Sequence, residues 1–315
     1  MGCDKEQAIS QLSHPQHPSI RPVGIVMDVI PVETIMHIFK YLERPELRAM
    51  TLVATRFRAV ATKNLYHKLF VDNSGLSRLL VSVKLNPLNA TMTKCATIWL
   101  NSRVTPLESW KELFDLLTHT TNLERLLFFP LGYGIEWYPP PLPKLQIFML
   151  RRLRMSAQLA ESLVALPELK CLKMGPTERL CALTTDPSPN SEHLKTIMNN
   201  LVEFKGSRTL IAYLRDYGKL KYLSISLSEG MEEEWRHLHQ VAGATLQFLR
   251  VYGVNMKEID ECHQLLSRVS RFSALRHLGV IPLNITDSPS TMVRHIAFAV
   301  GARIPIHLII EGFRS

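Results

Sequence analysis

The sequence of 315 residues lacks most features that assign a chain to a specialised class. Its 14 glycines and 19 prolines follow no period, which excludes collagen-like and low-complexity chains. The five cysteines are odd in number and form no Cys-x-x-Cys pair, so we expect neither a disulfide framework nor a zinc site. No apolar run approaches the roughly 18 residues that a transmembrane helix needs.

Sequence motifs of catalytic chemistry are missing as well. The chain has no GxxxxGK[ST] phosphate loop and no HExxH metal motif. His237 and His239 lie two positions apart, so on a helix they would point in different directions and would not share a metal. The first residues lack the apolar stretch of a secretory signal. We therefore expect no cofactor, and a location in the cytoplasm, the nucleus or both.

The composition favours a folded protein with a basic surface. Hydrophobic residues make up 46% of the chain and charged residues 21%, which is enough to form a large core. The net charge of +9 suits nucleic acid, acidic proteins or membranes as partners, and does not choose among them.

Three regions differ in their sequence pattern. Residues 1–27 are polar and interrupted by prolines, which indicates a flexible arm. Residues 28–70 carry a dense helical pattern that predicts three short helices and the start of a strand. So small a unit buries little by itself and usually leans on a partner or on the next domain. Residues 71–315 follow a different period.

That period is a repeated segment of the form Leu-x-x-apolar-x-apolar. Its first leucine recurs 19 to 32 residues apart, at Leu123, Leu145, Leu169, Leu201, Leu220, Leu246 and Leu275. Most intervals also hold a helix-like stretch, at residues 106–119, 156–166, 209–217, 232–241, 257–269 and 291–300. Strand plus helix at this spacing is typical of a leucine-rich-repeat solenoid, with a parallel sheet inside and helices outside. The Asn or Cys of the regular repeat is absent, so the repeats are degenerate and we expect irregular curvature.

Residues 30–70 resemble an F-box. The family pattern runs Leu-Pro-x-Glu, a helix ending Ile-Phe-x-x-Leu, a leucine-rich helix, a Val-x-x-x-(Trp/Phe) segment and Leu-Tyr before a strand. The chain has Ile-Pro-Val-Glu at 30–33, Ile-Phe-Lys-Tyr-Leu at 38–42, Leu-Val at 52–53, Arg-Phe-Arg at 56–58 and Leu-Tyr at 65–66. It departs from the pattern at Ile30 and at Phe57, where many members have Leu and Trp. Arg-Phe-Arg and Leu-Tyr resemble fungal members in particular.

The resemblance implies a non-catalytic receptor of an SCF (Skp–cullin–F-box) ubiquitin ligase. The F-box would dock on the Skp adaptor, and through it on a cullin, while the repeats bind the substrate protein. An apolar helical patch too large for its own small core is typical of a helix-packing interface. The predicted adaptor patch comprises Ile30, Pro31, Ile35, Ile38, Phe39, Leu42, Leu47, Leu52 and Val53. Which of them contact the adaptor and which fill the core of the unit stays open, and all of them could be core.

Strand alternation predicts which residues a substrate would meet. The residues between the apolar positions of each strand point to the open, concave face of the solenoid. Those with the most binding potential are basic and aromatic: Trp99, Arg125, Phe129, Arg151, Lys173, Lys205, Tyr222, Phe248, Arg250 and Tyr252. They predict an acidic or phosphorylated protein segment as the ligand, although the basic residues could simply reflect the overall charge. A scaffold without a ligase role, in which the first helices cap the solenoid, is the alternative, and a nucleic-acid binder is a weaker one.

Overall fold

The computed structural model describes residues 30–101, 104–131, 138–151, 155–175, 190–206, 208–214, 219–226, 232–254, 264–265, 267–282 and 307–310. The expected flexible arm at 1–27 and the expected helix at 291–300 lie outside these residues, as does the first part of the helix expected at 257–269.

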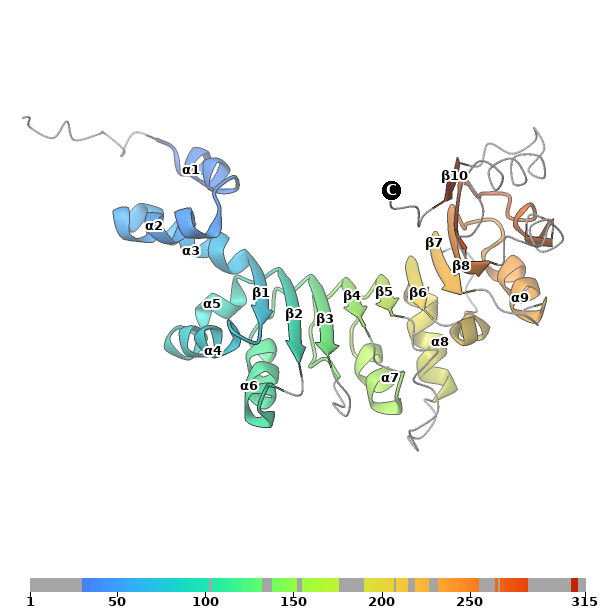
Figure 1. Cartoon of the computed structure of the whole chain (residues 1–315), viewed down its shortest axis with the longest axis horizontal. Coiled ribbons are helices and arrows are strands. Elements are labelled where there is room, and N and C mark those ends of the chain that lie inside the picture. Colours follow the sequence, from blue (N-terminus) through green and yellow to red (C-terminus); the bar gives the residue numbers. More distant parts are fainter. Residues whose placement is uncertain are drawn as a thin grey trace, which may run out of the picture.

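Ten strands form one sheet in which every neighbouring pair is parallel and the strand order equals the chain order. Each inner strand therefore pairs with the strand before it and the strand after it, and the first and last strands form the two edges (Figure 1). The strands are β1 (Lys68–Asp72), β2 (Cys95–Asn101), β3 (Arg125–Leu131), β4 (Ile147–Leu150), β5 (Cys171–Met174), β6 (Glu203–Gly206), β7 (Tyr222–Ser226), β8 (Phe248–Val254), β9 (His277–Pro282) and β10 (His307–Ile310).

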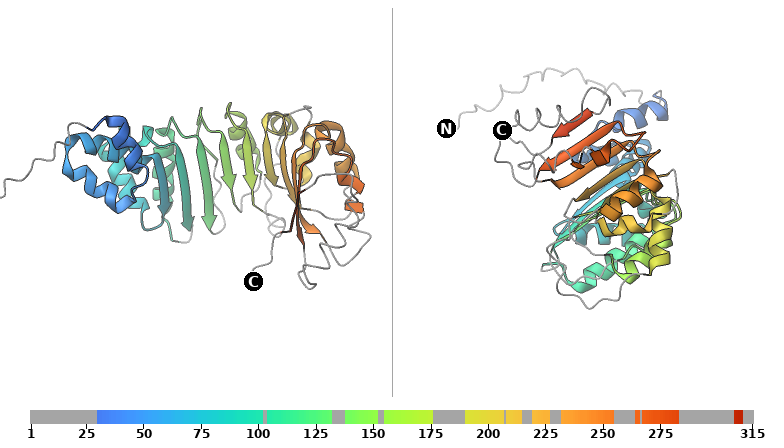
Figure 2. Two further views of the ribbon diagram at one scale, coloured as in Figure 1. Left: turned by 90° about the horizontal axis from the view of Figure 1, so that it is seen from above. Right: turned by 90° about the vertical axis from the view of Figure 1, so that its right-hand side faces the viewer.

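In the described parts of the connections, the helices lie on one side of the sheet. Figure 1 shows the sheet curving into an arc with these helices on the outer side, and Figure 2 shows the open face from above, with strands in front of helices. The helices are α4 (Leu76–Leu85), α5 (Leu88–Thr91), α6 (Leu107–Thr118), α7 (Ala157–Val164), α8 (Ser191–Asn200), α9 (Glu232–Ala242) and the 3₁₀ helix η2 (Arg208–Tyr213). The helices expected at 106–119, 156–166 and 232–241 are confirmed, and the stretch expected at 209–217 forms the 3₁₀ helix. Helices α4, α5 and α8 were not predicted.

The seven repeat leucines take one structural position. Each is buried and lies two residues before the first residue of a strand, β3 to β9 in turn. The backbone repeats with them: the carbonyl of Lys94 accepts hydrogen bonds from the amides of Glu124 and Arg125, at 2.8 and 3.0 Å, and the same two-amide contact recurs at the junctions that follow. The prediction that these leucines line one parallel sheet is confirmed.

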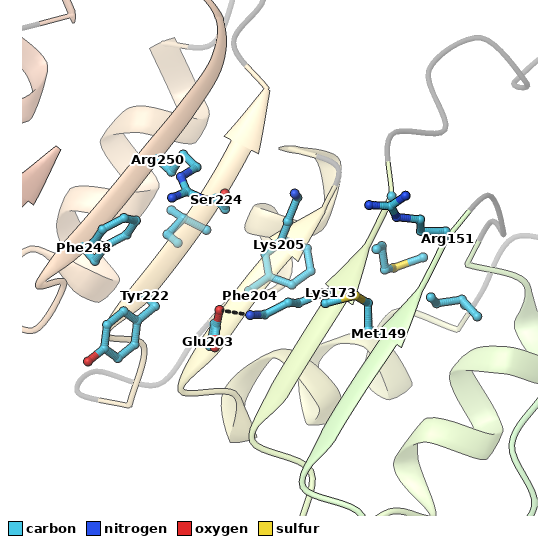
Figure 3. Close-up of a pocket in the computed structure, with 14 residues that line it drawn as sticks. Met149, Arg151, Lys173, Glu203, Phe204, Lys205, Tyr222, Ser224, Phe248 and Arg250 are labelled. Carbon is cyan, nitrogen blue, oxygen red and sulfur yellow. Dashed lines mark ion pairs between the residues drawn. The ribbon is translucent and has the colours of Figure 1, made fainter. Parts of the chain in front are cut away.

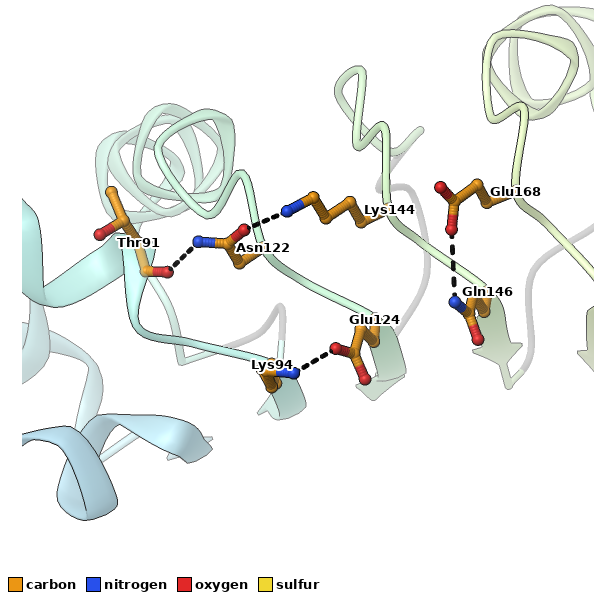
Figure 4. Close-up of polar contacts among 7 residues, drawn as sticks. All are labelled: Thr91, Lys94, Asn122, Glu124, Lys144, Gln146 and Glu168. Carbon is orange, nitrogen blue, oxygen red and sulfur yellow. Dashed lines mark hydrogen bonds and ion pairs between the residues drawn. The ribbon is translucent and has the colours of Figure 1, made fainter. Parts of the chain in front are cut away.

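Polar side chains join the segments that precede neighbouring strands, at the edge of the sheet where the strands begin (Figure 4). Asn122 donates a hydrogen bond to the backbone carbonyl of Thr91 at 2.8 Å and accepts one from Lys144 at 2.7 Å. Lys94 pairs with Glu124 at 2.6 Å. Of these contacts, the one from Asn122 satisfies a backbone carbonyl, and the other two join side chains from segments that precede neighbouring strands.

Two separate hydrophobic cores result. The larger one lies between the sheet and the helices and includes residues from Leu69 to Val280. The smaller one belongs to an N-terminal helical unit, called here the head, which consists of α1 (Val32–Phe39), α2 (Arg44–Val53) and α3 (Thr55–His67). No helix among the residues described above is long and apolar enough to cross a bilayer.

The head joins the sheet without a linker. Helix α3 ends at His67 and β1 begins at Lys68, so β1 crosses the domain boundary expected at residue 70. The Arg44 guanidinium at the start of α2 donates a hydrogen bond to the Lys68 carbonyl at 2.9 Å, and that of Arg56 donates to the Ile30 carbonyl at 2.6 Å. These contacts fix the fold of the head and its attachment to the first strand.

Candidate functional site

The head separates the predicted adaptor patch into inner and outer residues. Ile35, Phe39 and Leu47 are buried, and together with residues of α3 they form the core of the head. Ile30 and Leu42 are half-buried against this core. These three side chains are therefore core residues of the head, because so small a unit needs buried apolar residues for its own packing.

The remaining four residues of the predicted set are exposed. Leu52 is 82% exposed, Val53 61% and Ile38 48%, and Pro31 is also exposed. Two exposed residues were missed by the sequence reasoning, Val32 and Tyr41. Ile35, Ile38, Phe39 and Leu42 share one helix face by their i, i+3, i+4, i+7 spacing; Tyr41 lies off that face, and an apolar residue in such a place is the signal that could have found it. The outer surface of the head thus carries apolar side chains that its own core does not use.

The open face of the sheet presents three rows of side chains, because alternate strand residues point to the same side. The strand register aligns Lys68, Cys95, Arg125, Ile147, Cys171, Glu203, Tyr222, Phe248 and His277 in the first row. The middle row is Phe70, Thr97, Leu127, Met149, Lys173, Lys205, Ser224, Arg250 and Gly279. The third row includes Asp72, Trp99, Phe129, Ser226 and Tyr252. All ten residues predicted for this face lie on β2 to β8 or, in the case of Arg151, directly after β4.

A hollow of about 420 Å³ lies on this face between β4 and β8. Its lining includes four cationic side chains and one carboxylate (Figure 3): Arg151, Lys173, Lys205, Arg250 and Glu203. Eight of the ten predicted residues line it or contact a lining cation, since Tyr222 and Phe248 also line it, Tyr252 contacts Lys205 and Phe129 contacts Arg151. Trp99 and Arg125 lie on β2 and β3 and do not line it.

Each cation of the hollow has a fixed neighbour. The ammonium of Lys173 pairs with the carboxylate of Glu203 at 2.6 Å, and Glu203 also accepts a hydrogen bond from the Cys171 thiol at 3.2 Å. The other three lie over aromatic rings: Arg151 over Phe129 at 5.1 Å, Lys205 over Tyr252 at 5.0 Å and Arg250 over Phe248 at 5.4 Å from the ring centroid. An aromatic face attracts a cation without cancelling its formal charge.

Two acidic groups next to the hollow have shifted pKa values. Burial raises the pKa of the Cys171 thiol to about 12, and the negative charge of Glu203 adds to the shift. Burial also opposes ionisation of Tyr252, but hydrogen bonds with Ser224 and Lys205 outweigh it and lower the pKa of the phenol. Cys171 is therefore an unreactive thiol, and the cations around Tyr252 favour negative charge at that place.

His237 and His239 make separate hydrogen bonds. The imidazole of His237 contacts the Leu214 carbonyl at 2.7 Å and that of His239 contacts the Arg268 carbonyl at 2.8 Å, so they have separate partners. Within the described part of the chain, no three His, Cys, Asp or Glu side chains are grouped so that they could hold a metal ion.

Comparison with known proteins identifies one part of the chain. Residues 27–72 match the F-box-like family, which covers the whole head and β1. F-box domains bind Skp adaptors in SCF complexes. No curated protein matches the chain.

Proposed function

We propose that this protein is a substrate receptor of an SCF-type ubiquitin ligase. The F-box-like match at residues 27–72 carries the proposal, because F-box domains dock on Skp adaptors. The exposed side chains of the head support it: Ile38, Leu52 and Val53 are apolar, accessible and not used by the core beneath them. We assign the adaptor surface to these residues with Pro31, Val32 and Tyr41. A cullin would then be recruited through the adaptor.

The sheet and its helices would form the substrate-binding part, a degenerate leucine-rich-repeat solenoid. The sequential parallel strands, the buried leucine before each of β3 to β9 and the helices on the outer side support this classification. The open face offers basic and aromatic side chains for a protein ligand, and the receptor itself would contribute no catalytic group.

A scaffold without a ligase role is the second candidate. One observation favours it: α3 continues directly into β1, as expected if the three helices only cap the end of the stack. The two candidates differ in what the outer surface of the head does, since a cap needs no adaptor.

Co-purification of the full chain with a Skp adaptor separates the two. We expect a stable complex that the double variant Ile38→Glu/Leu52→Glu abolishes, because a charge cannot be buried unpaired in an apolar interface. Leu85→Glu on α4 is the matched control, since Leu85 is 82% exposed like Leu52 but lies outside the F-box-like region. Absence of a complex with the unaltered chain, or equal loss with Leu85→Glu, would favour the scaffold.

A further inference from the structure

The middle row of the open face changes its chemistry once along the sheet. On β1 to β4 it presents Phe70, Thr97, Leu127 and Met149, none of which is charged. On β5, β6 and β8 it presents Lys173, Lys205 and Arg250, with Ser224 between them on β7. The change falls between two adjacent strands, so one ligand lying along this row would meet an uncharged half, called here the apolar half, and a cationic half.

The apolar half has an exposed aromatic platform. The ring centroids of Trp99 and Phe129 lie 5.6 Å apart on β2 and β3. Trp99 is 44% exposed because it lies on the open face of the sheet. Phe70 on β1 is 54% exposed on the same face. Accessible aromatic side chains of this kind are the usual anchors of a protein interface.

The cationic half is suited to a dianion. The hollow between β4 and β8 has four cationic side chains and one carboxylate, a formal charge of +3. The carboxylate, Glu203, engages Lys173, whereas aromatic rings hold Arg151, Lys205 and Arg250. Gly279 contributes to this arrangement: a Cβ there would lie 3.3 Å from Cγ of Arg250, so the missing side chain leaves room for the arginine.

Building on the proposed receptor function, we propose that the open face binds an extended peptide with two anchors, a bulky apolar side chain on Trp99 and Phe129 and a phosphorylated side chain in the hollow. Four strand intervals separate β2 and β3 from β6 and β7, which is about 19 Å at about 4.8 Å each. An extended chain covers this distance in about six residues. The phosphate is favoured over a single carboxylate because it carries about two charges and accepts several hydrogen bonds from lysine and arginine.

A single-stranded nucleic acid would use cations and aromatic rings too, but with another distribution. Its backbone carries a charge at every nucleotide, so it needs cations along its whole path. Here the middle row lacks a cation over four consecutive strands, and on those strands the first row presents only Lys68 and Arg125, which lie on β1 and β3 with β2 between them. The observations therefore favour the peptide.

The test is binding of peptide libraries to the immobilised full chain. One library has a fixed phosphothreonine and degenerate flanks, and two matched libraries have glutamate or threonine in its place. We expect phosphothreonine peptides to be retained about tenfold better than threonine peptides, with aromatic or large aliphatic residues enriched about five to seven positions away. No phosphate preference, or no apolar enrichment at that spacing, would overturn the proposal, as would tighter binding of an oligothymidylate that the phosphopeptide cannot displace.

Variants locate each anchor on the selected phosphopeptide. Lys205→Met should weaken binding about tenfold, whereas Lys221→Met, a change of an exposed lysine just before β7, should not. Glu203→Gln should strengthen binding because it removes the repelling carboxylate, and a gain cannot arise from misfolding. Trp99→Ala should erase the apolar selection and leave the phosphate preference.

Equal effects of Lys205→Met and Lys221→Met would refute the site. Adaptor binding is measured on the same samples, so its absence with normal peptide selection would contradict only the receptor function.

Discussion

Two leucines on helix α2 allow the core and the docking surface of the head to be tested separately. Leu47 is 5% exposed and packs in the core of the head, whereas Leu52, five residues later on the same helix, is 82% exposed. Truncation of either to alanine removes the same atoms and keeps a good helix former. The two variants should therefore differ only through what surrounds each side chain.

The expected magnitudes follow from burial. Leu47→Ala removes packed methyl groups and leaves a cavity, which costs about 3 kcal/mol. The core of the head has only six buried residues, so this loss should unfold the head while the sheet stays folded. Leu52→Ala should change stability by less than about 0.5 kcal/mol. If Leu52 is an adaptor contact, the same variant should weaken adaptor binding by about 1–2 kcal/mol, or about five- to thirtyfold.

Hydrogen exchange resolved by segment gives the stability of the head, and titration with a Skp adaptor gives the affinity. Leu47→Ala should accelerate exchange in 32–67 and leave the strands protected. Leu52→Ala should leave exchange unchanged and lower the affinity. Equal acceleration by both variants would show that Leu52 is packed, and full affinity of a normally folded Leu52→Ala variant would remove it from the adaptor surface.

Three further predictions concern groups outside the head surface. At pH 8 the Cys171 thiol, with its pKa raised to about 12, should be alkylated about a thousandfold more slowly in the folded chain than in urea, as followed by mass spectrometry; equal rates would contradict its burial. Burial lowers the pKa of His67 and of His239, so as the pH falls these two imidazoles take up protons at a higher pH in the unfolded chain than in the folded chain. Stability should thus fall as the pH drops from about 7 to 5.5, and a constant denaturation midpoint would refute this. Glu124→Gln breaks the ion pair with Lys94, in which both side chains are partly exposed to water. It should therefore change the free energy of unfolding, measured in urea titrations, by less than about 1 kcal/mol. A larger change would show that this ion pair contributes more than an exposed pair does.

The sheet could be predicted from the sequence because its signal is repeated. A single Leu-x-x-apolar-x-apolar segment carries little information, but seven leucines that each precede a strand define one register. The register in turn fixes which side of each strand faces the helices, since a slip by one residue would exchange the two sides. That is why Phe129, Lys205 and Arg250 could be assigned to the open face before their contacts were known.

Other features depend on contacts that the sequence does not encode locally. Helix α4 was missed because its interval lacks one of the repeat leucines, and its role follows from packing beside α6. In the head, the apolar periodicity predicted one apolar face of α1, but it did not distinguish a face that packs on α3 from a face that binds a partner. Ile35 and Ile38 are three residues apart on the same helix, yet one is 2% exposed and the other 48%. The hollow depends on the sheet bringing together Arg151 directly after β4, Lys173 on β5 and Arg250 on β8.

The direct junction between α3 and β1 connects the two proposed surfaces mechanically. Because β1 follows His67 immediately and Arg44 donates to the Lys68 carbonyl, the head cannot rotate about a flexible linker. Each later strand is hydrogen-bonded to the strand before it, so the position of every strand relative to the head is fixed as well. A ligand held between β4 and β8 would keep a set distance and direction from an adaptor bound at the head. A receptor that presents its ligand to a second protein would use such a relation, so the direct junction agrees with the receptor as well as with the cap, and adaptor binding decides between them.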